Sequence, residues 1–283
     1  MRNFFMITNR QKDPDFAVTH HIKQYLENRG MQCRIQTESV VGKEGYTDPA
    51  QVPPDIDCIL VLGGDGTLLQ AAVDLADLDI PFLGINMGTL GFLAEVEKTG
   101  IEPALDRLAV ADYDIENRMM IFGQVQANGQ ICDDTRALND IVLTGKEAMQ
   151  LIYFNIYINH QLLNRYHADG IIIATPTGST GYNLSAGGPI VEPKAETILL
   201  TPICPHTISS RSIVLPAEDV VTIEIAAGRY GTPQETVVIF DGSHKVTLKT
   251  GDKIEVRKSE KRTAIVKLNQ VSFLDILHKK MSD

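Results

Sequence analysis

Cysteine is sparse in this chain, and the residues present lie far apart. They are Cys33, Cys58, Cys132 and Cys204, and no C-x-x-C pair occurs among them. Zinc sites and disulfide frameworks usually show closely spaced or clustered cysteines. The pattern therefore argues against a zinc site and favours reduced thiols, so we expect a cytoplasmic protein.

Long apolar runs and an excess of basic residues are also missing. No stretch has membrane-spanning length, and no secretory signal pattern is recognisable. With 26 Lys and Arg against 36 Asp and Glu, the formal net charge is −10. Such a charge disfavours nonspecific binding to nucleic acid or to anionic membranes. A phosphate ligand must then be held by local N–H groups, a few basic side chains or a divalent cation.

What remains is an ordinary globular composition. The 283 residues are 43% hydrophobic and 22% charged, which is typical of a chain that buries a substantial core. The length allows one large or two ordinary domains. No histidine pair has metal-ligand spacing with a third ligand nearby, so the sequence predicts no metal site built from protein side chains.

The stretch from Asp57 to Ala76 carries the first functional motif. An apolar run breaks into Gly63-Gly64-Asp65-Gly66-Thr67, and a helical pattern of apolar residues follows. Glycines let a phosphate approach the backbone closely, and the N–H groups at a helix start attract anions. A carboxylate in such a loop repels phosphate unless it accepts a proton or holds a metal. The alternative is structural, because Gly-Asp-Gly also forms tight turns and Asp is a good helix cap.

The first third of the chain alternates strand and helix patterns. This alternation predicts a doubly wound α/β domain with a mostly parallel sheet, in which ligands bind at the C-terminal ends of the strands. A second glycine-rich loop, between Gly84 and Gly91, also follows a strand. The two loops can therefore face one crevice.

From Tyr113 onward the pattern becomes mostly strand. Runs of β-branched and aromatic residues predict a sandwich-like β domain, with a hairpin turn at Asp241-Gly242. We expect the α/β domain to comprise residues 1–115 and 270–283, and the β-rich domain residues 116–269. The last segment, Val271 to Lys280, has nearly helical spacing, and we expect it to pack on the first domain.

Two polar motifs in the β-rich region point to ligand contacts. Asn139 and Asp140 stand at the start of an apolar strand, where they can bind sugar hydroxyls or an amide, or simply form a strand-entry turn. The block from Thr175 to Pro189 follows the apolar strand that starts at Asp169-Gly170. It gathers glycines, hydroxyl groups and Tyr182 before a short helix. This density of small residues favours a binding loop over a plain connection.

These motifs, in this order, resemble the NAD kinase family over nearly the whole chain. The resemblance rests on Gly63 to Thr67, Gly84 to Leu93, Leu138 to Asp140, Asp169-Gly170 and, most specifically, Thr175 to Pro189. It implies transfer of the terminal phosphoryl group of ATP to the adenosine-ribose 2′-hydroxyl of NAD+, which gives NADP+ and ADP. Asp65 is the general base that the resemblance implies.

The resemblance also implies contact roles for the other motif residues. It implies phosphate contacts at the glycine loop, adenosine and ribose contacts at Asn139 and Asp140, and stacking on Tyr182. The full set of binding residues that it implies is Gly63, Gly64, Gly66, Thr67, Phe92, Asn139, Asp140, His167, Asp169, Thr177, Thr180, Gly181, Tyr182, Asn183, Leu184 and Ser185. His167 stands where many relatives carry arginine, and a histidine is a weaker, pH-dependent phosphate contact.

The family further implies Mg²⁺ or another divalent cation bound with the nucleotide phosphates, and a homotetramer or homodimer. NAD+ and ATP would be the partners, with no nucleic acid or membrane. Two other functions share parts of the pattern. A lipid or other alcohol kinase shares the glycine loop, but the absence of a basic or apolar membrane-facing stretch counts against it. A non-catalytic NAD(P)-binding sensor would not need an intact Asp65 and Asn139.

Overall fold

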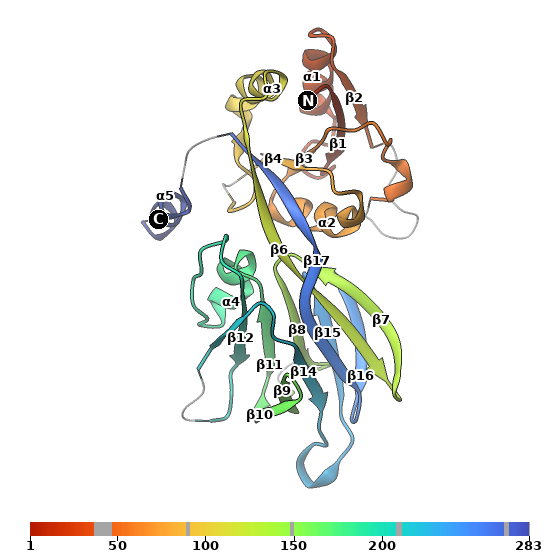
Figure 1. Ribbon diagram of the computed structural model, residues 1–283, viewed down its shortest axis with the longest axis vertical. Coiled ribbons are helices and arrows are strands. Elements are labelled where there is room, and N and C mark those ends of the chain that lie inside the picture. The colour runs from red at the N-terminus through yellow and green to blue at the C-terminus, as the bar shows by residue number, and fades with distance from the viewer. Residues whose placement is uncertain (37–46, 89–90, 148–149, 208–210, 269–271, 283) are drawn as a thin grey trace. The chain divides into compact units, whose positions relative to one another are not determined.

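The computed structural model describes residues 1–36, 47–88, 91–147, 150–207, 211–268 and 272–282. The chain divides into two compact units, here the α/β unit (Met1–Arg118 and Lys261–Asp283) and the β-rich unit (Met119–Glu260). Two long strands, β6 (Asp114–Ala127) and β17 (Lys253–Lys267), pair with each other, and each runs through a boundary between the units (Figure 1). The chain therefore passes from one unit to the other within strands.

The α/β unit alternates strands and helices along the chain. Its elements are β1 (Asn3–Thr8), α1 (Ala17–Glu27), β2 (Gln32–Ile35), β3 (Cys58–Gly63), α2 (Asp65–Asp74), β4 (Phe82–Asn86), β5 (Val96–Glu97), α3 (Ile101–Ala109), the end of β17 and α5 (Phe273–Met281). The sheet order is β17-β4-β3-β1-β2, and β4 also pairs with β5. All the pairings within this group for which the register is defined are parallel.

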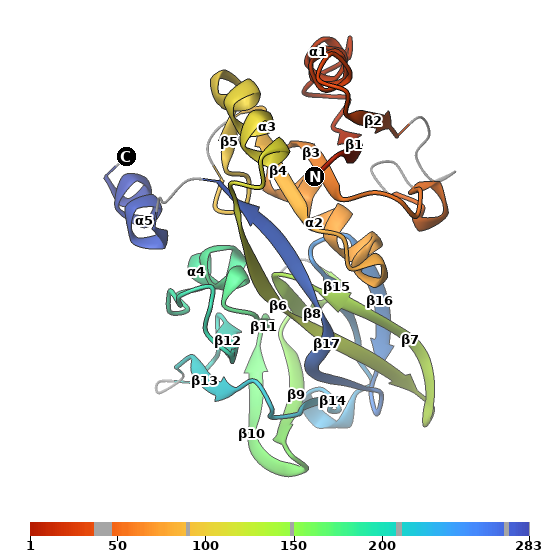
Figure 2. The same ribbon diagram turned by 45° about the horizontal axis from the view of Figure 1, so that its top comes forward.

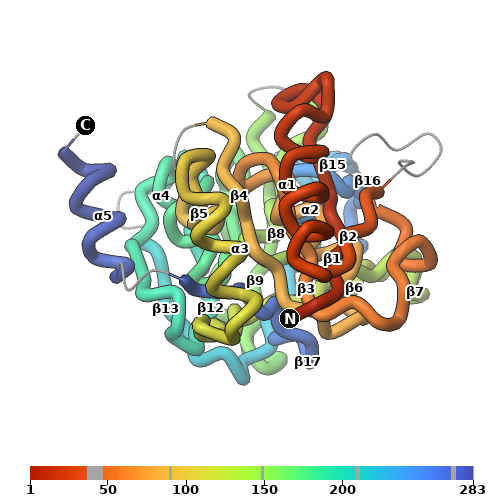
Figure 3. The backbone as a smooth tube through the Cα atoms, turned by 90° about the horizontal axis from the view of Figure 1, so that it is seen from above, coloured from red at the N-terminus to blue at the C-terminus, as the bar shows by residue number. Residues whose placement is uncertain are grey.

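Helices cover both faces of this parallel sheet. Leu60 and Leu83 share a buried cluster with residues of α1 and α3, and these two helices lie side by side (Figure 3). On the opposite face, a Cβ added to Gly84 would lie 2.8 Å from Cδ1 of Leu68 in α2. Since successive strand residues face opposite sides, α2 covers the face that α1 and α3 leave open. This is the doubly wound arrangement that the alternating pattern predicts.

The start of α1 is stabilised by a side chain that precedes the helix and its N-cap residue. Its N-cap residue is Phe16, which has a left-handed backbone and makes no side-chain cap bond. Asp13 instead accepts hydrogen bonds from the N–H groups of Val18 and Thr19, at 3.3 and 2.9 Å. These bonds lower the pKa of the Asp13 carboxyl, which burial would otherwise raise.

The C-terminal helix α5 begins with a capping box formed by Ser272 and Asp275. We expect it to start at Val271, which lies outside the described residues, and to pack on the first domain. Its Phe273 ring lies 6.1 Å from the Phe92 ring of the same unit. None of the helix's residues is buried, and Leu274 is 67% exposed. The contact is therefore limited to one edge of the helix.

The β-rich unit is built from antiparallel strands in two layers. One sheet has the order β13-β12-β11-β8-β15-β16, and the other contains β10-β9-β14-β17 together with β6 and β7. The bounds are β7 (Gln130–Ala137), β8 (Asp140–Gly145), β9 (Ile152–Ile158), β10 (Gln161–Ala168), β11 (Gly170–Ala174), β12 (Thr197–Ile203), β13 (Ile213–Pro216), β14 (Val221–Ile225), β15 (Glu235–Phe240) and β16 (His244–Lys249). A 3₁₀ turn (Thr177–Thr180) and the short helix α4 (Tyr182–Ser185) follow β11.

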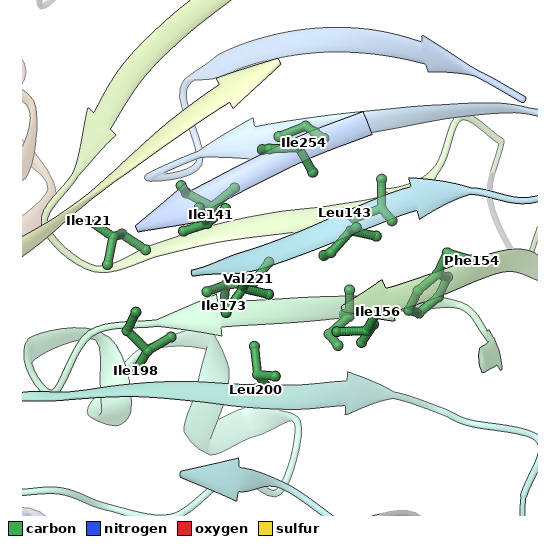
Figure 4. Close-up of a cluster of buried hydrophobic side chains, with 14 of the residues drawn as sticks. Ile121, Ile141, Leu143, Phe154, Ile156, Ile173, Ile198, Leu200, Val221 and Ile254 are labelled. Carbon is green, nitrogen blue, oxygen red and sulfur yellow. The ribbon is translucent and has the colours of Figure 1, made fainter. Parts of the chain in front are cut away.

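One hydrophobic cluster fills the space between these layers. Figure 4 shows Ile141, Ile173 and Leu200 from the first sheet among Ile156 and Val221 from the second, and all five are at most 1% exposed. Alternation along each strand produces this arrangement, since every second side chain points inward. The outcome agrees with the expected sandwich-like β domain. Among the described residues, no helix is long and apolar enough to span a membrane.

Candidate functional site

The glycine loop lies where the parallel sheet predicts a ligand, directly after β3 at the C-terminal end of the strand. Gly64 caps α2, and its carbonyl oxygen accepts the N–H groups of Thr67 and Leu68 at 3.0 and 3.2 Å. The N–H groups of Asp65 and Gly66 have no acceptor among the described residues. The first turn of the helix therefore presents unpaired donors and its positive dipole end to this loop.

Gly63 and Gly66 differ in the space that surrounds the position of a Cβ atom. A Cβ at Gly63 would lie 2.4 Å from Oγ1 of Thr67, so the protein itself excludes a side chain there. A Cβ at Gly66 would meet no atom within 4 Å. The Thr67 hydroxyl is fixed in turn by Asn9, whose Nδ2 lies 3.1 Å from it. Only Gly66 leaves a space that the folded chain does not fill.

The Asp65 carboxylate is bonded to a distant loop of the same unit. Oδ2 accepts the N–H of Phe92 at 2.7 Å, and Oδ1 accepts those of Leu93 and Ala94, each at 3.2 Å. A Cβ at Gly91 would lie 1.9 Å from Oδ1, so only glycine fits there. Asp65 makes no side-chain cap bond to its own helix. The structural alternative of a simple helix cap is therefore wrong for this residue.

Lys12 brings a cation to the glycine loop. It lies in the turn after β1, where its N–H bonds the carbonyl oxygen of Asn9 at 3.0 Å. Its Nζ would lie 2.8 Å from a Cβ at Gly64 and 3.4 Å from one at Gly88, which places the ammonium beside both glycine-rich loops. Among the described residues, Lys12 has no carboxylate partner. It is the cation best placed to take a ligand anion at this loop.

Phe92 lies beside the C-terminal helix of its own unit. Besides the Phe273 ring, the Nζ of Lys280 lies 5.0 Å from its ring centroid. Phe92 and helix α5 both border a cavity of about 530 Å³, whose lining includes Gly91, Ile276 and Lys279.

Within the described residues, no group of three histidine, cysteine or acidic side chains could hold a metal ion.

In the β-rich unit, the Asn139–Asp140 pair lies against the block that follows β11. Thr175 donates its N–H to the Asn139 carbonyl oxygen at 2.8 Å and its hydroxyl to that of Leu138 at 2.6 Å. A Cβ at Gly178 would lie only 2.1 Å from the Asn139 carbonyl oxygen. A Cβ at Gly181 would lie 3.6 Å from Nδ2 of Asn139 and 3.9 Å from Oδ2 of Asp140. The two motifs thus form one cluster at the end of β11, beside α4 (Figure 2).

Two carboxylates lie close together in this cluster. Asp140 is only 6% exposed, and the sequence alone does not reveal that Asp241 comes near it from the β15–β16 turn. Burial, reinforced by the charge of Asp241, raises the pKa of Asp140 to about 7. Burial also raises the pKa of Asp241 to about 6, although backbone N–H groups that it accepts oppose the rise.

The residues of α4 divide between the surface and the interior. Tyr182 and Leu184 are 47% and 41% exposed, and Ser185 is exposed as well. Asn183 is fully buried, with its amide bonded to the carbonyl oxygens of Ser179 and Pro189 and accepting the Thr201 hydroxyl. Its side chain therefore holds the block together. In the 3₁₀ turn, Thr177 is 6% exposed, and its carbonyl oxygen accepts the Thr180 hydroxyl.

His167 and Asp169 lie at the other end of β11. The strand pairs Gly170 with Thr144 and Ala174 with Asp140, so its two ends are separated by roughly 13 Å at about 3.3 Å per residue. His167 is exposed, and its ring centroid lies 4.3 Å from that of Tyr153, with the two ring planes tilted by 49°. Within one copy of the β-rich unit, these two residues are not brought together with Asn139 and Asp140.

Comparisons with known proteins decide the family. Residues 10–113 match the model of the ATP-NAD kinase N-terminal domain, and residues 138–268 match that of the C-terminal domain. The NAD kinase of Lachnoclostridium phytofermentans is 44% identical over 100% of both chains. That of Lachnospira eligens is 41% identical over 99% of this chain and 100% of its own. The chain belongs to the ATP-NAD kinase family.

Solved structures of NAD kinases share the fold. A yeast NADH kinase complexed with NADH is 25% identical, has a TM-score of 0.81, and is matched over 100% of this chain and 88% of its own. An NAD kinase from Archaeoglobus fulgidus in complex with ATP is also 25% identical, with a TM-score of 0.78 over 100% of both chains. These matches confirm the family resemblance and the expected pairing of an α/β domain with a mostly-β domain.

Two polar residues near the family motifs escape the sequence reasoning. Lys12 follows β1, and loops that follow parallel strands share one edge of the sheet, so its position could have flagged it. Asp241 stands in a sequence that predicts only a hairpin turn. Nothing local indicates that its carboxylate accepts a hydrogen bond from a segment about a hundred residues earlier in the chain.

Proposed function

We propose that this protein transfers the terminal phosphoryl group of ATP to the adenosine-ribose 2′-hydroxyl of NAD+, giving NADP+ and ADP. The observation that carries the proposal is the intact glycine loop in a family member that aligns with its relatives over the full length. Its Asp65 stands at the start of α2, beside unpaired N–H groups and Lys12. The ligands of the solved relatives, NADH and ATP, support a dinucleotide and a nucleoside triphosphate as substrates.

Asp65 is the general base in this proposal. Its carboxylate accepts backbone N–H groups on both oxygens, which fixes its orientation, and a carboxylate is in general a weak base. A weak base suits phosphoryl transfer, because the loose transition state needs little proton removal before the phosphoryl group has moved. Oδ2, which accepts one N–H, keeps a lone pair for the attacking hydroxyl.

The remaining motif residues bind the nucleotides. We assign Gly63, Gly64, Gly66 and Thr67, together with Lys12, to phosphate groups. Asn139 and Asp140 bind adenosine or ribose, with Thr177, Thr180 and Gly181 closing the same cluster. The exposed ring of Tyr182 stacks on a base, with Leu184 and Ser185 beside it, and Phe92 lines an adenine pocket. His167 and Asp169, at the far end of β11, contact a different part of the dinucleotide.

A divalent cation fits this chain as part of the nucleotide. Mg²⁺ would be held by the nucleotide phosphates, with Asp65 as the protein carboxylate at the loop. When bound, it neutralises charge on the transferring phosphoryl group. We also propose that the protein is cytoplasmic and forms a homodimer or homotetramer.

The test is direct. The purified protein is incubated with NAD+, ATP and Mg²⁺, and NADP+ is detected with a dehydrogenase that accepts only NADP+. The proposal expects NADP+ that depends on both substrates and on the cation. NAD+ binding without NADP+ formation would instead support the sensor function, and neither binding nor turnover would reopen the alcohol-kinase alternative.

Gly66→Ala is expected to raise the KM of a nucleotide substrate about tenfold while the protein becomes no less stable. Alanine in a helix is about 1 kcal/mol more favourable than glycine, and no protein atom lies within 4 Å of the added Cβ. A phosphate resting on the loop would meet that Cβ. Steady-state kinetics and thermal unfolding measure the two effects. A stability gain with unchanged kinetics would remove Gly66 from the phosphate contacts.

Lys12→Met is expected to raise the KM of the nucleotide whose phosphates lie on the glycine loop by about tenfold or more. A hydrogen bond to a charged group contributes about 1.5–3 kcal/mol, and methionine keeps the apolar stem without the charge. Lys23→Met is the matched control, because Lys23 is a half-exposed lysine of the same unit that pairs with Glu27 on α1. Equal kinetics for the two variants would exclude a ligand contact at Lys12.

A further inference from the structure

The turn between β15 and β16 contains a carboxylate that the turn itself does not need. Three residues separate the paired Phe240 and His244, and the first two, Asp241 and Gly242, have the left-handed φ values of 43° and 72° that a primed turn requires. In the two-residue β6–β7 turn of the same unit, Asn128 and Gly129 have a similar pair of left-handed φ values, 52° and 77°. Asparagine therefore suffices for this geometry, and the charge at Asp241 needs another reason.

The Asp241 carboxylate accepts three consecutive backbone N–H groups from the segment that precedes β8. Oδ2 accepts Leu138 at 2.7 Å, and Oδ1 accepts Asn139 at 2.8 Å and Asp140 at 3.0 Å. The Asp241 N–H in turn bonds the Asp140 carbonyl oxygen at 3.0 Å. Three successive N–H groups that converge on one anion form a concave backbone nest. The Asp241 side chain in the turn therefore binds the N–H groups of this segment.

Thr175 binds the carbonyl groups of the same segment, because its hydroxyl donates to the Leu138 carbonyl oxygen and its N–H to that of Asn139. Both the N–H and the carbonyl groups of the peptide units around Asn139 are therefore hydrogen-bonded. The Asn139 amide and the Asp140 carboxylate are consequently aimed at the position of Gly181, 3.6 and 3.9 Å from where its Cβ would lie. The orientation of both side chains therefore depends on the hydrogen bonds that Asp241 and Thr175 make to the backbone of this segment.

Holding two carboxylates together is unfavourable for folding. The negative charge of Asp241 raises the pKa of Asp140, and burial raises the pKa of both. The three N–H donors act against this rise at Asp241. A turn that served folding alone would avoid this repulsion with an asparagine, as the β6–β7 turn does. Local choices that work against stability are expected at functional sites.

We propose that Asp241 is a positioning residue for nucleotide binding, which fixes the Leu138–Asp140 backbone so that Asn139 and Asp140 meet the ligand. The inference rests on the proposed function in one respect, namely that this cluster binds NAD+. Asp241 itself makes no ligand contact in this proposal. Its removal should weaken binding of NAD+ without an equal effect on ATP.

Two variants and one control test the proposal. Asp241→Asn keeps the turn and one acceptor oxygen but loses the charge, whereas Asp241→Ala loses all three bonds. Asn128→Ala is the control, because Asn128 also has a left-handed backbone, in the other hairpin turn. We expect the KM and the calorimetric Kd for NAD+ to rise about tenfold in Asp241→Asn and further in Asp241→Ala. The KM for ATP should change less than twofold, and Asn128→Ala should lose stability alone.

A ligand-free measurement separates this inference from the proposed function. Hydrogen exchange of the Leu138, Asn139 and Asp140 amides should accelerate in Asp241→Ala but not in Asn128→Ala. Faster exchange with unchanged NAD+ affinity would make Asp241 a structural residue and overturn the proposal, as would unchanged exchange. If the wild type binds NAD+ but makes no NADP+, the reaction is wrong, while the Kd values still decide the role of Asp241. A wild type that binds no NAD+ overturns both.

Discussion

Asp65→Asn is expected to lower kcat for NADP+ formation by about 10³-fold, within the range of 10²–10⁴ that a positioned general base contributes. The amide cannot accept the proton of the attacking hydroxyl, and it places an N–H₂ group where a carboxylate oxygen stood. Because the side chain keeps its shape and one oxygen, it can still accept from Leu93 and Ala94. The KM values should therefore change much less than kcat.

The control for Asp65→Asn must separate chemistry from the loss of backbone hydrogen bonds. Asp57 is a suitable match, because its Oδ2 accepts the N–H groups of Arg2 and Asn3 at 2.6 and 2.9 Å at the other end of the same sheet. We expect Asp57→Asn to lose stability and keep kcat. If Asp65→Asn instead behaves like Asp57→Asn, the carboxylate serves only to hold the Phe92–Ala94 backbone, and the general base lies elsewhere.

Local sequence patterns predict most of the elements that place the glycine loop. The apolar run of β3, the glycines and the amphipathic α2 follow one another without interruption, so strand, loop and helix can be assigned from neighbours alone. Strands with little burial were harder to predict. In β10, six of the eight residues are exposed, so the alternation that marks a strand is missing. The Asn128-Gly129 pair, a strong hairpin signal, could have revealed β7.

Long-range partners of the site residues could not be predicted in this way. The N–H groups that bind the Asp65 carboxylate come from residues 27 to 29 positions later, and the Asp241 bonds span more than a hundred. The sequence reveals that a residue carries a carboxylate, but it does not reveal which N–H groups donate hydrogen bonds to that carboxylate. Burial of Asp140 beside Asp241 is likewise a property of packing, because each residue alone is typical of a turn. The motifs thus indicate where the chemistry lies, while tertiary bonds determine which oxygen faces the ligand.

Gly178→Ala is expected to reduce kcat/KM for NAD+ by about 100-fold and to destabilise the protein. The added Cβ would lie 2.1 Å from the Asn139 carbonyl oxygen, and both partners are backbone, so neither can turn away as a side chain would. Relief requires the 3₁₀ turn to move away from Asn139, which lengthens the Thr175 bonds. Overpacking of this kind costs about 1–3 kcal/mol, and a displacement of about 1 Å at a site can lower the rate about 100-fold.

Gly181→Ala is the matched control for Gly178→Ala, three residues further along the same block. Its Cβ would stand 3.3 Å from the Gly178 carbonyl oxygen and farther from Asn139 and Asp140, so small adjustments suffice. We expect wild-type stability, so that any loss in kcat/KM for NAD+ reports the contact of the ligand with Gly181 rather than a displaced backbone. Near-wild-type kinetics in Gly178→Ala would mean that the cluster adapts freely, and the close packing of the block on Asn139 would then have no role in binding NAD+. A large loss in Gly181→Ala alone would instead place the ligand directly on Gly181, since the folded chain accommodates that methyl group.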